Sequence, residues 1–154
     1  MIFISYKRDP DRPLAQLIQT QLSARGVETW LDVTFSPGQR WEDIIAGAIA
    51  GATDVIVILS NAVVKSDDTY VGREIEIALA QGKSIIPVTT PTFVWPAQDE
   101  SPSWLNSVRQ YHAVAASWDY PDAFAKRLIS FCSAPPAKRS LLNWLAFWRR
   151  RVAA

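Results

Sequence analysis

Hydrophobic residues follow two alternating patterns along this chain. Short, largely apolar runs predict strands, and they occupy residues 3–5, 27–31, 54–60 and 84–88, with a weaker run at 111–114; the run at 54–60 is continuous, as in a strand buried on both faces. Between these runs, apolar side chains recur every three or four positions, which predicts amphipathic helices. The helical patterns cover residues 14–22, 41–49, 75–80, 104–108 and 121–131. Residues 89–103 show neither pattern and are predicted to form a long loop.

The alternation of strands and helices predicts an α/β fold with a doubly wound parallel sheet of about five strands. Right-handed crossovers then place helices on both faces of the sheet. Ligands of such sheets bind outside the carboxyl ends of the strands, so residues that directly follow a strand are the first candidates for a site. With 154 residues, the chain fits one domain of ordinary size plus a short appendage.

The last part of the chain differs from the rest, so we divide it into a domain at residues 1–133 and a segment at 134–154. The segment combines a Pro-Pro linker with a Trp-containing amphipathic helical pattern that ends in three arginines. It holds five basic residues and no acidic ones, which leaves eleven basic and fifteen acidic residues in the domain. An acidic domain argues against nucleic-acid binding by that part. Three uses of the basic helix stay open: contact with an anionic membrane surface, packing on protein, and connection to an absent C-terminal part.

Rare residues restrict the remaining classes of site. Cys132 is the only cysteine, so no intrachain disulfide can form. The chain opens without the features of a signal peptide, and no apolar stretch has the roughly 18 residues of a membrane span, so we expect a cytoplasmic protein. His112 is the only histidine, which excludes a Ser-His-Asp triad built on any other base. We expect no metal site, and the Gly-x-Gly-x-x-Gly fingerprint of dinucleotide-binding dehydrogenases is absent.

Several motifs, in order along the chain, resemble those of TIR domains. They are the first strand and its loop at 3–8, the second strand and the following BB loop at 30–41, the third strand at 54–60, the catalytic helix Tyr-Val-Gly-Arg-Glu-Ile-Glu-Ile-Ala-Leu at 70–79, and the strand after it at 82–88. The match is close over residues 2–88 and loose over 104–132. It resembles bacterial, NAD+-cleaving TIR domains more than receptor adaptors. The resemblance implies a flavodoxin-like fold.

The resemblance makes Glu74 the expected catalytic residue. In catalytic TIR domains, the glutamate at this place in the motif faces the ribose attached to the nicotinamide of NAD+. Cleavage of that bond passes through an oxocarbenium-like transition state, which a nearby carboxylate stabilises. The pyridinium ring departs as neutral nicotinamide, so one carboxylate suffices where ordinary glycosidases need two. Without the resemblance, Glu74 would be interpreted as a solvated residue near a helix start, where the helix dipole favours acids.

Two neighbours of Glu74 belong to the same predicted helix. Glu76 lies two residues further, about 200° around the helix, so it cannot share the face of Glu74 and we assign it no role. Tyr70 stands four residues before Glu74, where the family often has tryptophan. Two roles stay open for its ring: stacking on the substrate, or covering the edge of the sheet.

The resemblance also implies a set of substrate-binding residues. They are Ser5, Tyr6, Lys7, Arg8, Asp32, Phe35 and Tyr70. The first two lie at the carboxyl end of the first strand, where the crevice is expected. Lys7 and Arg8 stand where the family places basic residues near the dinucleotide, although a solvated turn is the alternative. Asp32 and Phe35 match positions that border the family's pocket, and Asp32 has the alternative role of ending the second strand.

The BB loop implies a second kind of function. In the family, this loop packs against a neighbouring TIR domain and completes the pocket in a head-to-tail assembly. Its residues here are Ser36, Pro37, Gly38, Gln39, Arg40 and Trp41. A Pro-Gly pair is also the ordinary composition of a type II turn, so the sequence alone leaves both interpretations open. A head-to-tail contact that does not close gives filaments rather than discrete dimers.

Together, these features predict an NAD+ nucleosidase that self-assembles. NAD+ is expected as the substrate, with no cofactor, and the products are nicotinamide plus ADP-ribose or a cyclic isomer. By analogy, the biological setting is prokaryotic antiphage immunity. Two alternatives remain at this stage: a TIR scaffold that only binds other TIR domains, and a different nucleoside-processing enzyme of similar fold, such as a deoxyribosyltransferase-like protein.

Overall fold

A computed structural model describes residues 1–31, 40–65 and 70–133 of the chain. A five-stranded sheet lies at its centre, with the strand order β2-β1-β3-β4-β5 and parallel pairing throughout. The strands are β1 (Ile2–Ser5), β2 (Thr29–Trp30), β3 (Asp54–Leu59), β4 (Ser84–Thr89) and β5 (Val114–Ala115). The helices are α1 (Arg8–Ala24), α2 (Trp41–Gly51), α3 (Asn61–Lys65), α4 (Tyr70–Ala80), the 3-10 helix η1 (Gln98–Glu100), α5 (Ser103–Val108) and α6 (Pro121–Ser130).

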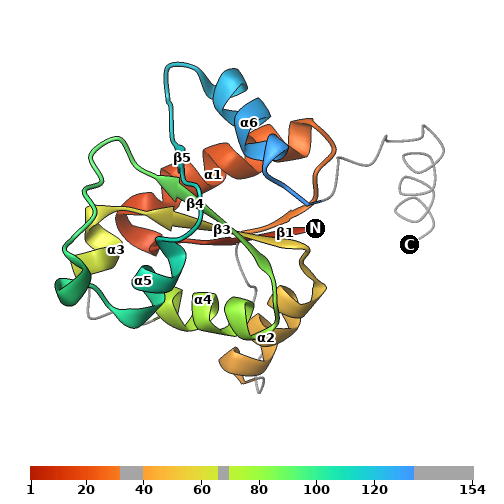
Figure 1. Ribbon diagram of the computed structural model, residues 1–154. Helices are drawn as coiled ribbons and strands as arrows, with labels where there is room; N and C mark the ends of the chain where they lie inside the picture. The colour runs from red at the N-terminus through yellow and green to blue at the C-terminus, as the bar shows by residue number, and fades with distance from the viewer. Residues whose placement is uncertain (32–39, 66–69, 134–154) are drawn as a thin grey trace.

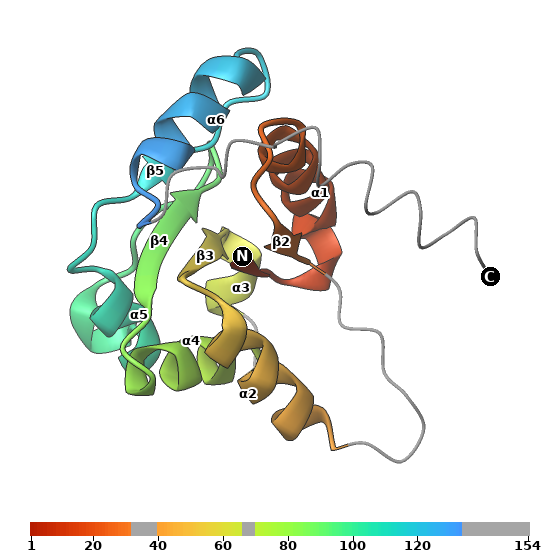
Figure 2. The ribbon, with the colours of Figure 1, turned by 90° about the vertical axis from the view of Figure 1, so that its right-hand side faces the viewer.

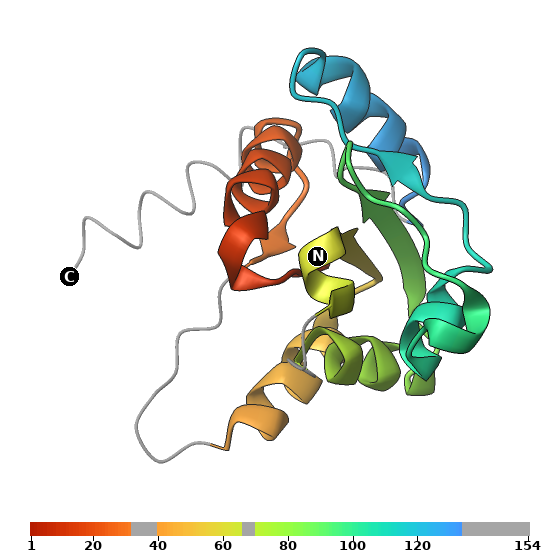
Figure 3. The ribbon, with the colours of Figure 1, turned by 90° about the vertical axis from the view of Figure 1, so that its left-hand side faces the viewer.

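Helices cover both faces of the sheet and divide the core into two halves. Helices α1 and α6 lie on one face, and α2, α4 and α5 lie on the other (Figure 1). The same layers are visible from both sides (Figure 2 and Figure 3). Alternate residues of β3 supply the two halves, because Ile56 and Ile58 pack with α1 and α6 while Val55, Val57 and Leu59 pack with α2, α4 and α5. The predicted α/β fold is therefore confirmed, and its strand order is the flavodoxin-like one.

The second strand is shorter than the apolar run at 27–31 predicts, because the end of α1 uses part of that run. Gly26 has φ 79°, the Gly26 amide donates to the Ser23 carbonyl, and the Val27 amide donates to the Leu22 carbonyl. This is the Schellman arrangement that closes a helix on a glycine. Val27 therefore belongs to the helix cap, and only Thr29–Trp30 pairs with β1.

The end of the domain differs from the prediction in a similar way. The Tyr111 amide donates to the Val108 carbonyl and so continues the end of α5, which moves the fifth strand from the predicted 111–114 to Val114–Ala115. The sequence patterns did not predict α3 or η1. Helix α3 has only five residues, too few for a helical period to be recognised.

The last described residue, Ser133, is bonded to the amino-terminal edge of the sheet. Asp54, the first residue of β3, is fully buried and accepts hydrogen bonds from the Ser133 amide and the Ser133 hydroxyl. The predicted segment at 134–154 lies outside the described residues. Among the helices of the described ranges, none is long and apolar enough to cross a membrane.

Candidate active site

Glu74 and Ser5, which are 69 residues apart, meet at the carboxyl end of the first strand. Ser5 is the last residue of β1 and is 1% exposed, and its hydroxyl donates to Glu74 Oε2 over 2.5 Å. Glu74 lies in the second turn of α4 and is half-buried. The side chain of Ser5 points to the α2/α4/α5 face, the same face as Phe3 two residues earlier. A carboxylate is thus held at the sheet edge where ligands of doubly wound folds bind.

The packing of α4 presents Glu74 and Glu76 differently. Val71, Ile75 and Ala78 are buried against the sheet, which orients the helix. Glu74 lies beside this stripe and turns to Ser5, whereas Glu76 is exposed on another side. The expectation that the two glutamates face different directions agrees with this placement.

A close contact between α4 and α5 fixes the first turn of the helix that carries Glu74. The indole of Trp104 packs so tightly on Gly72 that a Cβ placed there would lie 2.7 Å from Trp104 Cδ1. Glycine is thus required at this position by space. Sequence reasoning did not single out Gly72, although a glycine inside a helical pattern is a signal of close packing.

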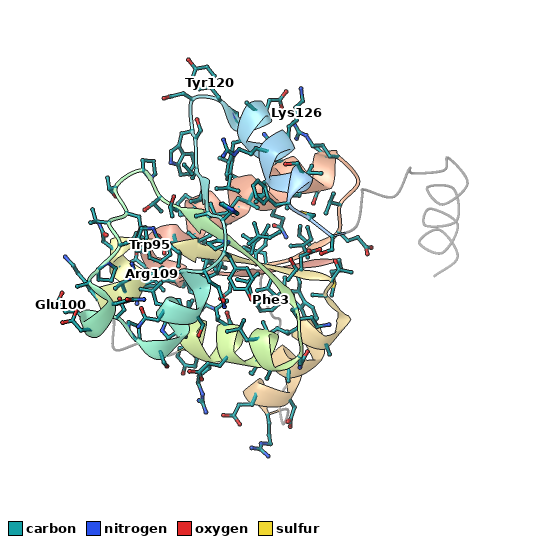
Figure 4. The ribbon with its side chains drawn as sticks, in the orientation of Figure 1. Phe3, Trp95, Glu100, Arg109, Tyr120 and Lys126 are labelled. Carbon is teal, nitrogen blue, oxygen red and sulfur yellow. The ribbon has the colours of Figure 1, made fainter. Side chains whose placement is uncertain are left out.

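Helix α5 is itself anchored to the long predicted loop. Trp95 and Arg109 lie next to each other (Figure 4), with Arg109 Cζ 4.9 Å from the centre of the Trp95 ring. The Arg109 guanidinium also donates to the Pro96 carbonyl over 2.7 Å. These contacts give the loop a defined course beside the helices that flank Glu74.

An ion pair links α4 with the start of α2, directly after the predicted BB loop. Arg73 Nη2 lies 2.6 Å from Glu42 Oε1, and Arg40 Nη2 lies 3.5 Å from Glu42 Oε2. Both arginines and Glu42 are more than 45% exposed, so each pair contributes roughly 0–1 kcal/mol. Their importance is positional, because Arg73 immediately precedes Glu74 in the chain.

The other predicted substrate-binding residues are placed in different surroundings. Tyr6 packs against the α1/α6 half of the core, on the face of the sheet opposite to Glu74. Lys7 is half-buried at the start of α1 and Arg8 is exposed. Tyr70 opens α4 and is 55% exposed, and both of its predicted roles stay predictions.

The remaining site predictions fall mostly on residues without a described structure. Asp32, Phe35, Ser36, Pro37, Gly38 and Gln39 lie outside the described residues. Arg40 is exposed, and Trp41 begins α2 without a described side chain. The structure therefore leaves the predictions for these positions as predictions.

A crevice lies at the carboxyl edge, on the α1 side of the sheet. It has a volume of about 340 Å³, and its walls include Asp11, Ser60, Thr90 and Trp118. Asp11 is 4% exposed and accepts a hydrogen bond of 2.7 Å from the Ser60 hydroxyl. Burial raises the pKa of the Asp11 carboxyl above its ordinary value, against the opposing effects of the Ser60 hydroxyl and the Lys7 charge. Glu74 does not line this crevice.

The histidine and the cysteine occupy unremarkable positions. His112 is exposed, and Cys132 packs against the α1/α6 half of the core. Burial, and to a lesser extent the Asp54 charge, raises the pKa of the Cys132 thiol to about 11, which suppresses the reactive thiolate. Within the described ranges, no three His, Cys, Asp or Glu residues come together as a metal site would require.

Comparisons with known proteins agree with the fold and the motifs. The NAD(+) hydrolase SARM1 of Danio rerio is 29% identical over 143 residues, a match that covers 89% of this chain and 20% of SARM1. The TIR domain of the Toll-related receptor TRR-2 from Hydra magnipapillata superposes with a TM-score of 0.61 at 22% identity, covering 84% of this chain and 94% of that chain. The CMP N-glycosidase of Clostridium botulinum superposes with a TM-score of 0.56 at 17% identity, covering 82% of this chain and 95% of that chain.

The family itself follows from the extent of the match. The chain spans only a fifth of the length of SARM1, so the comparison concerns one domain of that protein. A family model described as the TIR domain matches residues 2–129, which includes every described strand and nearly all of α6. The chain therefore belongs to the TIR domain family.

Proposed function

We propose that this TIR domain cleaves NAD+ at the bond between nicotinamide and ribose, with Glu74 as the catalytic carboxylate. The observation that carries the proposal is the half-buried Glu74 carboxylate, held by Ser5 at the carboxyl edge of the sheet. The relatives from Danio rerio, Drosophila melanogaster and Caenorhabditis elegans, 28–29% identical to this chain, are NAD(+) hydrolases and support the same chemistry here.

The reaction needs one negative charge in the right place. As the C–N bond breaks, its electron pair leaves with nicotinamide, which becomes neutral, and positive charge develops on the ribose. The Glu74 carboxylate stabilises that charge, which is worth more in a partly water-excluded site than in bulk water. Addition of water and loss of a proton then give ADP-ribose, while attack by a group of the same molecule gives a cyclic product.

Substrate-binding roles follow from position along the carboxyl edge. We assign Lys7 and Arg8 to the pyrophosphate, because both follow β1 and carry the matching charge. The exposed ring of Tyr70, one turn before Glu74, is assigned to stacking on the nicotinamide or its ribose. Tyr6, Asp32 and Phe35 complete the proposed binding set by resemblance to the family.

Assembly is the second part of the proposal. Residues 36–41 form the proposed contact with a neighbouring TIR domain, in a head-to-tail arrangement. The Glu42–Arg73 ion pair supports a link from this contact to α4, because Arg73 adjoins Glu74. A cytoplasmic location, an antiphage role and membrane contact by 134–154 rest on analogy or composition alone. NAD+ acts in this scheme as the substrate, with no cofactor.

Nicotinamide release from NAD+ tests the proposal. The protein is assayed at high concentration or in a crowding agent, so that assembly is favoured, with Glu74→Ala and Glu76→Ala side by side. Both glutamates lie on α4, but only Glu74 bonds Ser5, so Glu76→Ala is the matched control. We expect release by the wild type and by Glu76→Ala, and none by Glu74→Ala.

The assay also separates the alternatives. If no protein releases nicotinamide under conditions where particles are visible, the scaffold function replaces the enzyme. If CMP or a deoxynucleoside is cleaved and NAD+ is not, the nucleoside-processing alternative replaces it. The fold shared with the CMP N-glycosidase justifies including CMP among the substrates.

A further inference from the structure

We propose that Ser5 is a positioning residue for Glu74 and not a ligand of the substrate. Its hydroxyl keeps the Glu74 carboxylate ionised and in one orientation at the carboxyl edge of the sheet. The sequence motifs placed Ser5 in the substrate-binding set, and the contact with Glu74 gives it this other role. This inference rests on the proposed function of Glu74.

The single proton of the Ser5 hydroxyl is already used. A serine hydroxyl has one proton to donate, and here that proton is directed to Glu74 Oε2 over 2.5 Å. Ser5 is also only 1% exposed, so a solute has almost no access to it. The Ser5 proton is therefore not free for donation to a substrate, and the burial of the side chain leaves little access to its lone pairs.

Ser5 and Glu74 differ in rigidity. Ser5 belongs to β1, which pairs with β2 on one side and β3 on the other, and Ser5 itself is paired with Val57, so its backbone is fixed by the sheet. Glu74 projects from a helix on a side chain with three rotatable bonds, so its carboxylate has many accessible positions. A bond to a rigid strand therefore restricts the carboxylate to fewer of these positions.

The Ser5 hydroxyl also acts electrostatically on the Glu74 carboxylate. A distance of 2.5 Å lies in the range of a hydroxyl that donates to an ionised carboxylate. Such a donor favours the charged form over the neutral form. The proposed chemistry requires the charged form, so removal of the donor has a cost that grows as the pH falls.

The test is the pH dependence of nicotinamide release by Ser5→Ala. We expect the acidic limb of kcat/KM to move up by about one pH unit, so that activity falls about tenfold on that limb and less at higher pH. We expect kcat to carry the loss while KM changes less than about twofold. An unmoved acidic limb, or a raised KM with unchanged kcat, would overturn the positioning role and restore Ser5 as a substrate ligand.

Ser60→Ala is the matched control. Ser60 is also a buried serine at the carboxyl edge, and its hydroxyl also donates to a carboxylate, but that carboxylate is Asp11 on the opposite face. We expect its acidic limb to stay in place. If Ser60→Ala moves the limb as much as Ser5→Ala, the effect is a general one of destabilisation and the proposal fails. Should Ser5→Ala lose its fold, Ser5→Cys retains a weaker donor of similar shape and is expected to show a smaller shift in the same direction.

A carboxyl titration separates failure of this inference from failure of the proposed function. The 13C signal of the Glu74 carboxyl, assigned with Glu74→Gln, is followed against pH in the wild type and in Ser5→Ala. We expect a higher titration midpoint in Ser5→Ala whether or not NAD+ is cleaved. Equal midpoints would overturn the positioning role even in an active enzyme, whereas a shifted midpoint in an inactive protein would leave it standing and remove only the proposed function.

Discussion

Two serines lie at the carboxyl ends of neighbouring strands, and the hydroxyl of each donates a hydrogen bond to a carboxylate on a helix. Ser5, the last residue of β1, donates to Glu74 of α4. Ser60, directly after β3, donates to Asp11 of α1. The pairs lie on opposite faces because the side chains of strands alternate. Both bonds run from a serine hydroxyl to a carboxylate oxygen, over 2.5 Å and 2.7 Å.

The difference lies in what else each pair is connected to. The Ser60 hydroxyl also accepts the Val63 amide over 3.2 Å and so caps α3, and Asp11 is almost completely buried. Glu74 is only half-buried, and it projects from the second turn of α4 at the carboxyl edge of the sheet. A carboxylate closed in by the fold holds elements together, whereas one that remains partly open can act on a ligand. The burial of the carboxylate and the further contacts of the serine, rather than the serine–carboxylate bond itself, distinguish the structural role of Asp11 from the proposed catalytic role of Glu74.

The largest expected effect separates the two carboxylates by activity. Glu74→Gln keeps an oxygen that can accept the Ser5 hydroxyl but removes the charge, so we expect nicotinamide release to fall about 10²–10³-fold. Asp11→Asn removes the other charge, and we expect release within about twofold of the wild type. Steady-state assays at saturating NAD+ measure both. Equal losses in the two variants would contradict the comparison.

The next effect separates the two serines by stability. Ser60→Ala loses the α3 cap and leaves the buried Asp11 without its donor, so we expect unfolding to become easier by about 1–2 kcal/mol. Ser5→Ala removes one bond to a half-exposed group, for which we expect about 0.5–1.5 kcal/mol. Urea titrations followed by circular dichroism give the two values. A larger loss for Ser5→Ala would mean that its bond serves the fold first.

A third substitution disturbs α4, the helix that carries Glu74, without changing a member of either serine–carboxylate pair. Gly72→Ala drives a methyl into the Trp104 indole, which costs about 1–3 kcal/mol, offset by up to about 1 kcal/mol of helix propensity. We expect a net loss of stability together with reduced nicotinamide release. Gly47→Ala, in α2 with nothing within 4 Å, is the control and should gain about 0.5–1 kcal/mol. Thermal unfolding of both variants checks the opposite signs.

The smallest effect concerns Asp11 and pH. Because burial raises its pKa, the folded state binds this proton more tightly than the unfolded state. The stabilisation from this group is complete below its ordinary pKa of 3.8 and is lost as pH rises through the raised value. Asp11→Asn stays neutral and can still accept from Ser60, so we expect it to be more stable than the wild type at neutral pH. The difference should close below about pH 4 in urea titrations.

The sequence predicted an element best where all residues of an apolar run belong to that one element. The apolar run at 54–60 is buried on both faces and became the central strand β3 with one residue of error. Val27 is also apolar but belongs to the cap of α1, because in a helix that ends on glycine the amide of the next residue bonds back to the helix. Local hydrophobicity cannot show which of two adjacent elements takes such a residue.

The candidate site was predicted only in part, for a different reason. Resemblance to the family singled out Glu74, and the rule for parallel sheets placed Ser5 at the right edge. Their mutual bond depends on how α4 packs on the sheet, including the Trp104–Gly72 contact, and no local pattern contains that information. Asp11 was missed because an acid near a helix start usually faces water, whereas here the kinked start of α1 turns it inward.

The bonds from Ser133 to Asp54 have a practical consequence for handling the domain. They tie the end of the described chain to the amino-terminal edge of the sheet, and Glu74 lies at the carboxyl-terminal edge. A linker or fusion partner joined after Ser133 therefore starts on the side away from Glu74. Immobilisation through that end, on a bead or a sensor chip, would orient the domains with Glu74 facing outward.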